Sequence, residues 1–103
     1  MKRASYNNFF MNFASQSKFD IIMALRDGPL SVSEIAKKVS EEQSAVSHNL
    51  KKMTTCSVLT VKRAGKRRIY SLNDRTVIPI LKIVEEHVRQ NCIKGCKDGK
   101  DIS

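Results

Sequence analysis

Six polar side chains within residues 43–53 have the types and spacing needed to contact a nucleic acid. Glutamine can bond adenine through two hydrogen bonds, and serine or histidine can donate to purine acceptors. Lysine is better suited to phosphates than to base edges. An ordinary exposed polar surface is the alternative, and base contact is the interpretation we favour. The six residues are Gln43, Ser44, Ser47, His48, Lys51 and Lys52.

The same stretch predicts an amphipathic helix, because Val46, Leu50 and Met53 follow a helical apolar spacing. A short helix should precede it, opened by a capping box with Ser31 at the N-cap and Glu34 three residues later. The turn between them leaves two possibilities. Either Ser40 caps the second helix in another capping box, or that helix starts later, near Glu42. Both give the order of a helix-turn-helix.

A β-hairpin is predicted after this pair of helices. Residues 58–61 are rich in β-branched side chains, and residues 69–72 alternate again as a returning strand. The intervening turn, residues 62–68, has Gly65 near its tip. A hairpin with a basic tip after a helix-turn-helix is a wing, whose cations can reach phosphates or the minor groove. The candidate contacts are Arg63, Lys66, Arg67 and Arg68.

Two further helices should flank this core. One is capped by Ser15 or Ser17 and runs to Arg26. A Phe-rich segment at residues 5–13 precedes it and packs either on its own domain and a second copy or on its own domain alone. The last runs from residues 73–74 to Asn91, with Pro79 making its first turn irregular. It is apolar on more than one stripe, which favours a C2 dimer.

The predicted fold class is therefore mainly α with a small β-hairpin: a winged helix-turn-helix that dimerises through its first and last helices. We assign residues 1–92 to one DNA-binding and dimerisation domain, and residues 93–103 to a flexible tail.

The composition supports a polyanionic partner, because the net charge is +9 and residues 51–68 contain seven basic and no acidic side chains.

No signal peptide or membrane span is recognisable, so a cytoplasmic, reduced protein is expected. No catalytic triad, carboxylate pair or phosphate loop is present, and we predict that the chain is not an enzyme. No cofactor is required by this interpretation.

Three cysteines and two other side chains are candidates for sensing. Cys92 and Cys96 have i, i+4 spacing, so they could bind a metal or metalloid ion or form a disulfide, with Asp74 and His87 as added ligands from a partner's last helix. Two unremarkable thiols are the alternative. Cys56 is expected to be a small core residue; the sharper interpretation is a thiol that transmits oxidation or metal binding to the DNA-contacting helix.

The chain resembles the ArsR/SmtB family of winged-helix repressors over residues 17–91, most specifically at residues 33–36, 43–51 and 67–72. The resemblance implies a homodimer that binds an inverted repeat in double-stranded DNA and is released by a metal ion, a metalloid or a thiol oxidant. The family's thiolate site, which would fall near residues 31–35, has no cysteine here. In the family's site on the last helix, Asp74 and His87 match two ligands, whereas Thr76 and Gln90 occupy the other two positions.

The leading hypothesis is a sequence-specific transcriptional repressor, and its release from DNA by a metal, a metalloid or thiol oxidation is an additional hypothesis. The alternative is a winged-helix protein-interaction module without a small-molecule inducer. A DNA-binding regulator controlled only by its abundance is the third possibility.

Overall fold

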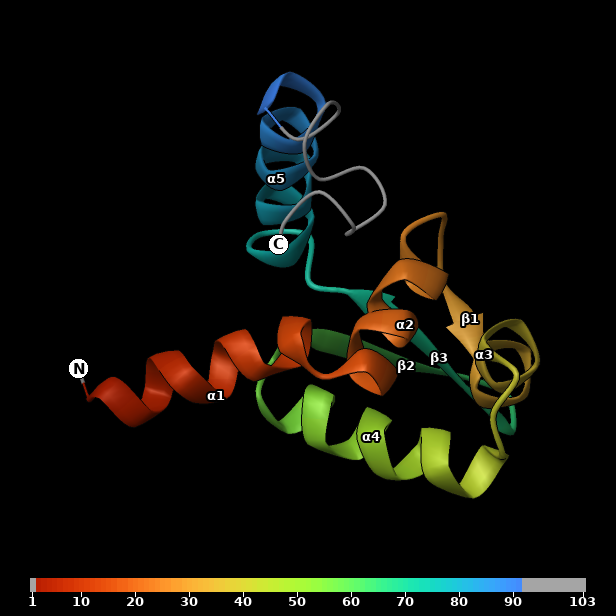
Figure 1. Ribbon diagram of the computed structural model, residues 1–103. Helices are drawn as coiled ribbons and strands as arrows, with labels where there is room; N and C mark the ends of the chain where they lie inside the picture. Colours follow the sequence, from red (N-terminus) through yellow and green to blue (C-terminus); the bar gives the residue numbers. More distant parts are fainter. Residues whose placement is uncertain (1, 92–103) are drawn as a thin grey trace. The chain divides into compact units, whose positions relative to one another are not determined.

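The computed structural model describes residues 2–91 and divides into two compact units, Met1–Asn73 and Asp74–Ser103. The first unit contains helices α1 (Arg3–Ala14), α2 (Gln16–Leu25), α3 (Val32–Val39) and α4 (Gln43–Thr55). Its strands are β1 (Leu30–Ser31), β2 (Leu59–Ala64) and β3 (Arg67–Leu72) (Figure 1). The second unit is described over helix α5 (Val77–Asn91). This is the mainly helical class with a β-hairpin that the sequence predicts.

The first unit buries one apolar core between α2, α3, α4 and the sheet. Its side chains come from the apolar faces of α2, α3 and α4 and from residues 58 and 59, where the chain enters β2, and all are at most 3% exposed: Ile21, Ile22, Leu25, Ile35, Val46, Leu50, Met53, Val58 and Leu59. Burial of this set holds the two helices of the helix-turn-helix at a defined position against the hairpin.

Two predicted helix starts are confirmed. Ser15 caps α2 by accepting from the backbone N–H of Lys18. At α3 both halves of the capping box form: the Ser31 hydroxyl accepts from the Glu34 N–H at 3.3 Å, and the Ser31 N–H donates to the Glu34 carboxylate at 2.8 Å. These bonds satisfy backbone donors that the first turn of a helix leaves free.

The turn between α3 and α4 decides between the two starts considered for α4. Ser40 has left-handed backbone angles (φ 58°) and closes α3, with its N–H bonded to the Ala36 carbonyl. An N-cap needs an extended backbone, so the second capping box at Ser40 is wrong. The later start is confirmed: Glu42 is the N-cap, and both Glu41 and Glu42 precede the helix.

The hairpin is longer and tighter than predicted. β2 and β3 pair from Leu59↔Leu72 out to Ala64↔Arg67, which leaves a two-residue turn at Gly65 and Lys66 in place of the predicted turn over 62–68. Gly65 has φ 66°, the positive angle that such tight hairpin turns require. A strand that the sequence analysis did not predict, β1, pairs with β3 on its other side and gives the order β1-β3-β2.

The last helix begins later than predicted, at Val77, after a turn over residues 74–76. Pro79 is consequently the third residue of α5, where no backbone N–H is needed for an intrahelical bond. The irregularity that the sequence predicts for the first turn lies before the helix, because residues 74–76 form a non-helical turn. Val77 and Leu81 are buried, whereas Ile83, Val84 and Val88 are 69%, 49% and 44% exposed.

A candidate nucleic-acid interface on α4 and the hairpin

Helix α4 separates its apolar and polar residues by face. Val46, Leu50 and Met53 are fully buried. All six of the polar candidates are exposed: Gln43, Ser44, Ser47, His48, Lys51 and Lys52. Asn49 adds a contact that the sequence analysis missed, because its amide donates to the Ser17 hydroxyl at 3.3 Å and joins α4 to α2. The packed face therefore fixes the helix while the polar face remains open to a partner.

The hairpin extends the exposed basic surface. Arg63, Lys66, Arg67 and Arg68 are all exposed. Arg63 and Arg68 are directly opposite each other across β2 and β3. Like charges so placed repel in the free protein, and a polyanion lying over them would relieve that repulsion.

Arg67 differs from its basic neighbours, because its guanidinium is bound within the chain. It donates to the Ser31 hydroxyl at 2.8 Å and lies 3.3 Å from the Glu34 carboxylate. The backbone N–H and hydroxyl of Ser31 lower the pKa of Glu34, and the charge of Arg67 acts in the same direction. The start of α3 and the hairpin are thus joined by one polar cluster, which comprises Ser31, Glu34 and Arg67.

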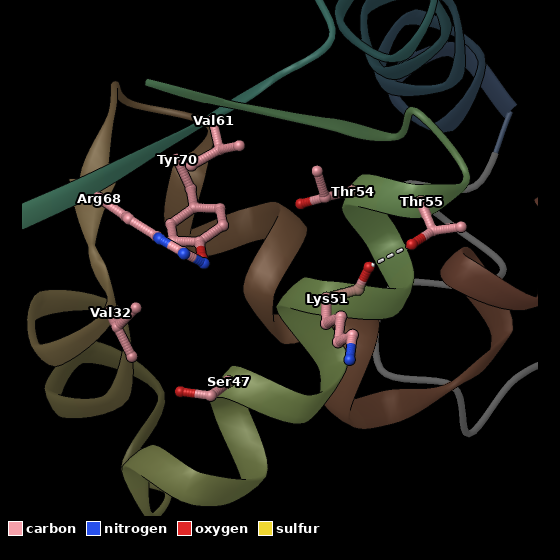
Figure 2. Close-up of a pocket in the computed structure, with 8 residues that line it drawn as sticks. All are labelled: Val32, Ser47, Lys51, Thr54, Thr55, Val61, Arg68 and Tyr70. Atoms are coloured by element: carbon pink, nitrogen blue, oxygen red, sulfur yellow. Dashed lines mark hydrogen bonds between the residues drawn. The ribbon is translucent and has the colours of Figure 1, made fainter. Parts of the chain in front are cut away.

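A groove of about 610 Å³ lies between α4 and the hairpin. One stripe of α4 provides Ser47, Lys51, Thr54 and Thr55. Val61, Arg68 and Tyr70 line the opposite wall, and Val32 at the start of α3 completes the lining (Figure 2). Thr54 had not been singled out, although its spacing of three from Lys51 and seven from Ser47 places it on the same helical stripe.

Cys56 is exposed, so the expectation of a small core residue there is wrong. It follows the last residue of α4 as the C-cap, and the chain turns at Ser57 before the buried Val58. The position after a helix is set by how the chain leaves the helix, which the three-residue spacing from Met53 did not indicate.

The residues proposed for metal or redox sensing are only partly described. Asp74 and His87 are both exposed, in the turn before α5 and within α5. The helical rise alone separates Val77 from His87 by roughly 15 Å, so one chain cannot bring both side chains to one ion. Among residues 2–91 no group of three or more His, Cys, Asp or Glu side chains could hold a metal ion. Cys92, Cys96 and the predicted flexible tail lie outside the described residues.

A packed helix pair with an exposed polar second helix, followed by a basic hairpin, defines a winged helix-turn-helix protein. Sequence comparison agrees, since the sequence model described as "Bacterial regulatory protein, arsR family" matches residues 15–58. The chain belongs to this ArsR family of DNA-binding transcriptional regulators. No helix in the described part of the chain is long and apolar enough to cross a membrane.

Two curated relatives are transcription regulators. The HTH-type transcriptional regulator NmtR of Mycobacterium tuberculosis is 40% identical over 68 residues, which cover 66% of this chain and 57% of that protein. The transcriptional repressor SmtB homolog of Synechocystis is 29% identical over 83 residues, which cover 81% of this chain and 63% of that protein. The matches span less than two thirds of either relative.

Solved structures agree with this fold. The solution structure of apo-NmtR is 33% identical, with a TM-score of 0.71, covering 84% of this chain and 73% of that chain. A homodimeric winged helix-turn-helix DNA-binding domain from Mycobacterium bovis has a TM-score of 0.77 at 18% identity, covering 86% and 82%. The predicted family and the predicted winged helix-turn-helix fold are thereby confirmed, whereas dimerisation through the first and last helices stays a prediction.

Proposed function

We propose that this protein is a transcriptional repressor that binds an operator in double-stranded DNA. The observation that carries the proposal is the exposed polar face of α4 on a helix whose other face is fully buried. A helix fixed in this way can enter the major groove with little loss of its own freedom, because its packing already defines its orientation. Family membership supports the same function.

The short polar side chains of α4 and the long basic side chains have different roles in this proposal. Base edges are contacted by Gln43, Ser44, Ser47 and His48, whose side chains carry short or planar hydrogen-bonding groups. The long cations hold phosphates and set the position of the protein on the duplex: Lys51, Lys52, Arg63, Lys66 and Arg68. Arg67 is bound to Ser31 and Glu34 and positions the hairpin instead.

A duplex titration with two variants tests the division. Ser47→Ala with His48→Ala should reduce the preference for the operator over random DNA and leave non-specific binding nearly unchanged, since phosphates supply most non-specific affinity. Lys82→Ala, an exposed cation on α5, is the matched control. Equal loss on both duplexes would show that Ser47 and His48 position the helix without contacting bases. Absence of salt-sensitive binding to any duplex would leave an acidic protein partner, the interaction-module alternative.

The functional unit in this proposal is a homodimer on an inverted repeat. On α1, Tyr6, Phe10 and Met11 are each more than half exposed, and α5 exposes the apolar side chains named above. Large apolar side chains at this density are typical of interfaces. Two copies related by a two-fold axis would present two α4 helices to successive major grooves.

The oligomeric state is measured directly by sedimentation. Phe10→Glu and Ile83→Glu should each shift the protein toward monomer and weaken operator binding, because a charge would be buried in the interface. Lys82→Glu, next to Ile83 in the sequence, controls for the added negative charge. Unchanged sedimentation for both apolar variants would place the interface elsewhere.

Relief of repression by a metal ion, a metalloid or a thiol oxidant is the finer part of the proposal, and it comes from the family resemblance. Asp74 and His87 fit a shared ion only if they come from different subunits. Operator release is measured with Zn²⁺, Cd²⁺, As(III) and a disulfide oxidant, on the wild type and on Cys92→Ser with Cys96→Ser. Release that persists in the cysteine variant would point to Cys56 or to Asp74 with His87.

A further inference from the structure

One wall of the groove between α4 and the hairpin is formed by side chains on the face of the hairpin that the alternation of residues directs toward the core. Leu59, Val61 and Arg63 alternate along one face of β2, and their partners on β3 are Leu72, Tyr70 and Arg68. Leu59 and Tyr70 are buried, at 1% and 7% exposure, yet Val61 is 39% exposed. An apolar side chain on the core-facing side of a hairpin is thus left uncovered at the groove.

The wall of the groove that α4 forms also contains a buried polar group whose hydrogen bonding is not satisfied within the described residues. Thr54 Oγ1 is buried, and within the described part of the chain it has no hydrogen-bond partner. The neighbouring Thr55 hydroxyl, by contrast, donates to the Lys51 carbonyl at 2.9 Å. Figure 2 shows the Thr54 hydroxyl directed away from the α4 ribbon, on the side where Tyr70 lies. Buried hydroxyls without partners are uncommon in folded proteins, so this one calls for a group that would complete it.

The lining combines three kinds of chemistry. Lys51 and Arg68 supply positive charge from opposite walls. Thr54 supplies a hydroxyl that is unpaired within the described residues, while Val61 and the ring of Tyr70 supply apolar surface. Small-molecule sites are of this kind: mostly apolar, with a few polar groups that orient the ligand, and with volumes of roughly 300–1,000 Å³.

We propose that this groove binds a small organic anion, namely an aromatic carboxylate. Its carboxylate would lie between Lys51 and Arg68, and its ring would cover Val61 and Tyr70. A bare phosphate satisfies the cations only and leaves Val61 in water. The exposed apolar wall therefore distinguishes an organic anion from an inorganic one.

Occupation of the groove opposes DNA binding, an inference that rests on the proposed function. Lys51 and Arg68 belong to the cations assigned to DNA phosphates, so a carboxylate between them removes two charge-assisted contacts in each protomer. Operator affinity should fall by about tenfold or more. Residues 2–91 could thus respond to an organic anion without binding a metal ion.

Binding is tested on the full chain without DNA, by ¹H–¹⁵N NMR titration with benzoate and 2-naphthoate. Both carboxylates should give saturable shifts at the amides of Thr54, Val61 and Tyr70. Inorganic phosphate and the neutral 2-naphthalenemethanol should not give this pattern. No saturable shift with either carboxylate at about 10 mM, or an equal pattern with phosphate, would overturn the proposal.

Two variants test the walls, and a third is the control. Val61→Ser removes the apolar surface, and Arg68→Gln removes one charge; each should weaken 2-naphthoate binding at least about fivefold. Thr60→Ser changes a side chain on the opposite face of β2 and should leave binding unchanged. Wild-type affinity in both groove variants would mean that the carboxylate binds elsewhere.

The competition is measured separately, by fluorescence anisotropy of operator DNA at constant ionic strength. Naphthoate should release the wild type, whereas Val61→Ser should bind DNA normally and resist release. NMR shifts without any DNA binding would overturn the proposed function and keep the site. Normal DNA binding that saturating naphthoate does not weaken would overturn the competition.

Discussion

Replacing Arg67 with alanine tests whether this side chain contacts a DNA phosphate or positions the hairpin. The sequence places Arg67 among equivalent wing cations. In the structure its guanidinium bonds the Ser31 hydroxyl and lies beside the Glu34 carboxylate, at the first turn of α3. β1 and β3 also pair there, with Ser31 opposite Ile69. Loss of Arg67 should therefore loosen the attachment of the hairpin to the helix-turn-helix.

The size of the effect follows from the contact with Ser31. A hydrogen bond from a charged donor contributes about 1.5–3 kcal/mol when it is well protected. The Arg67 side chain is 59% exposed, and solvent reduces this to about 1 kcal/mol. If all of it serves to hold the hairpin in the DNA-binding position, operator affinity falls by about fivefold.

The assay is operator affinity measured against salt concentration. A cation that contacts phosphate contributes about 0.9 to the slope of log K against log salt. Arg68→Ala, the matched control, should lower the slope by about this amount per protomer. Arg67→Ala should lower the affinity with an unchanged slope, and Glu34→Gln should add little to it, because both disrupt one cluster. A slope reduced as much as in Arg68→Ala would refute the positioning role.

Three further predictions concern stability, each measured by thermal or denaturant unfolding. Thr54→Val removes a buried hydroxyl that has no partner among residues 2–91 and should stabilise the protein by about 1 kcal/mol, raising Tm by roughly 4–8 °C; a lower Tm would show that the hydroxyl has a partner. Ser40→Gly removes the strain of a left-handed serine and should stabilise by up to about 1 kcal/mol, whereas Ser40→Ala should not. Because the folded-state pKa of Glu34 is lowered, its stabilising contribution is complete above the ordinary pKa of 4.5 and is lost as pH falls through the lowered value. Glu34→Gln should flatten the unfolding free energy in this acid range, and an unchanged profile would contradict the assignment.

The helix-turn-helix was predictable because its signals are local. The capping box joins Ser31 to a residue three positions later, and the apolar stripe of α4 repeats within two turns. Such contacts form within one helix, so residue type and spacing are enough to predict them. The polar face of α4 follows from the same periodicity, and its exposure in the structure agrees with that prediction; its contacts with DNA stay predictions.

The errors occurred where distant segments meet. The predicted turn over 62–68 was too long because pairing extends through the basic residues as far as Ala64 and Arg67, although their types favour a loop. Strand register depends on the whole pair and on the turn geometry, which single-strand composition does not contain. Cys56 was misplaced for a related reason, because its exposure depends on the direction in which the chain leaves α4.

By itself, the sequence of this protein determined the two helices of the DNA-binding motif, the capping box of α3 and the chemistry of the surface offered to a partner. Only the tertiary structure decided that Arg67 holds the hairpin to α3, and that Thr54 and Val61 line one groove. These pairs are brought together by the pairing of β1 with β3 and by the packing of α4 against the hairpin. Interactions of that kind join residues far apart in the chain, and no local spacing encodes them.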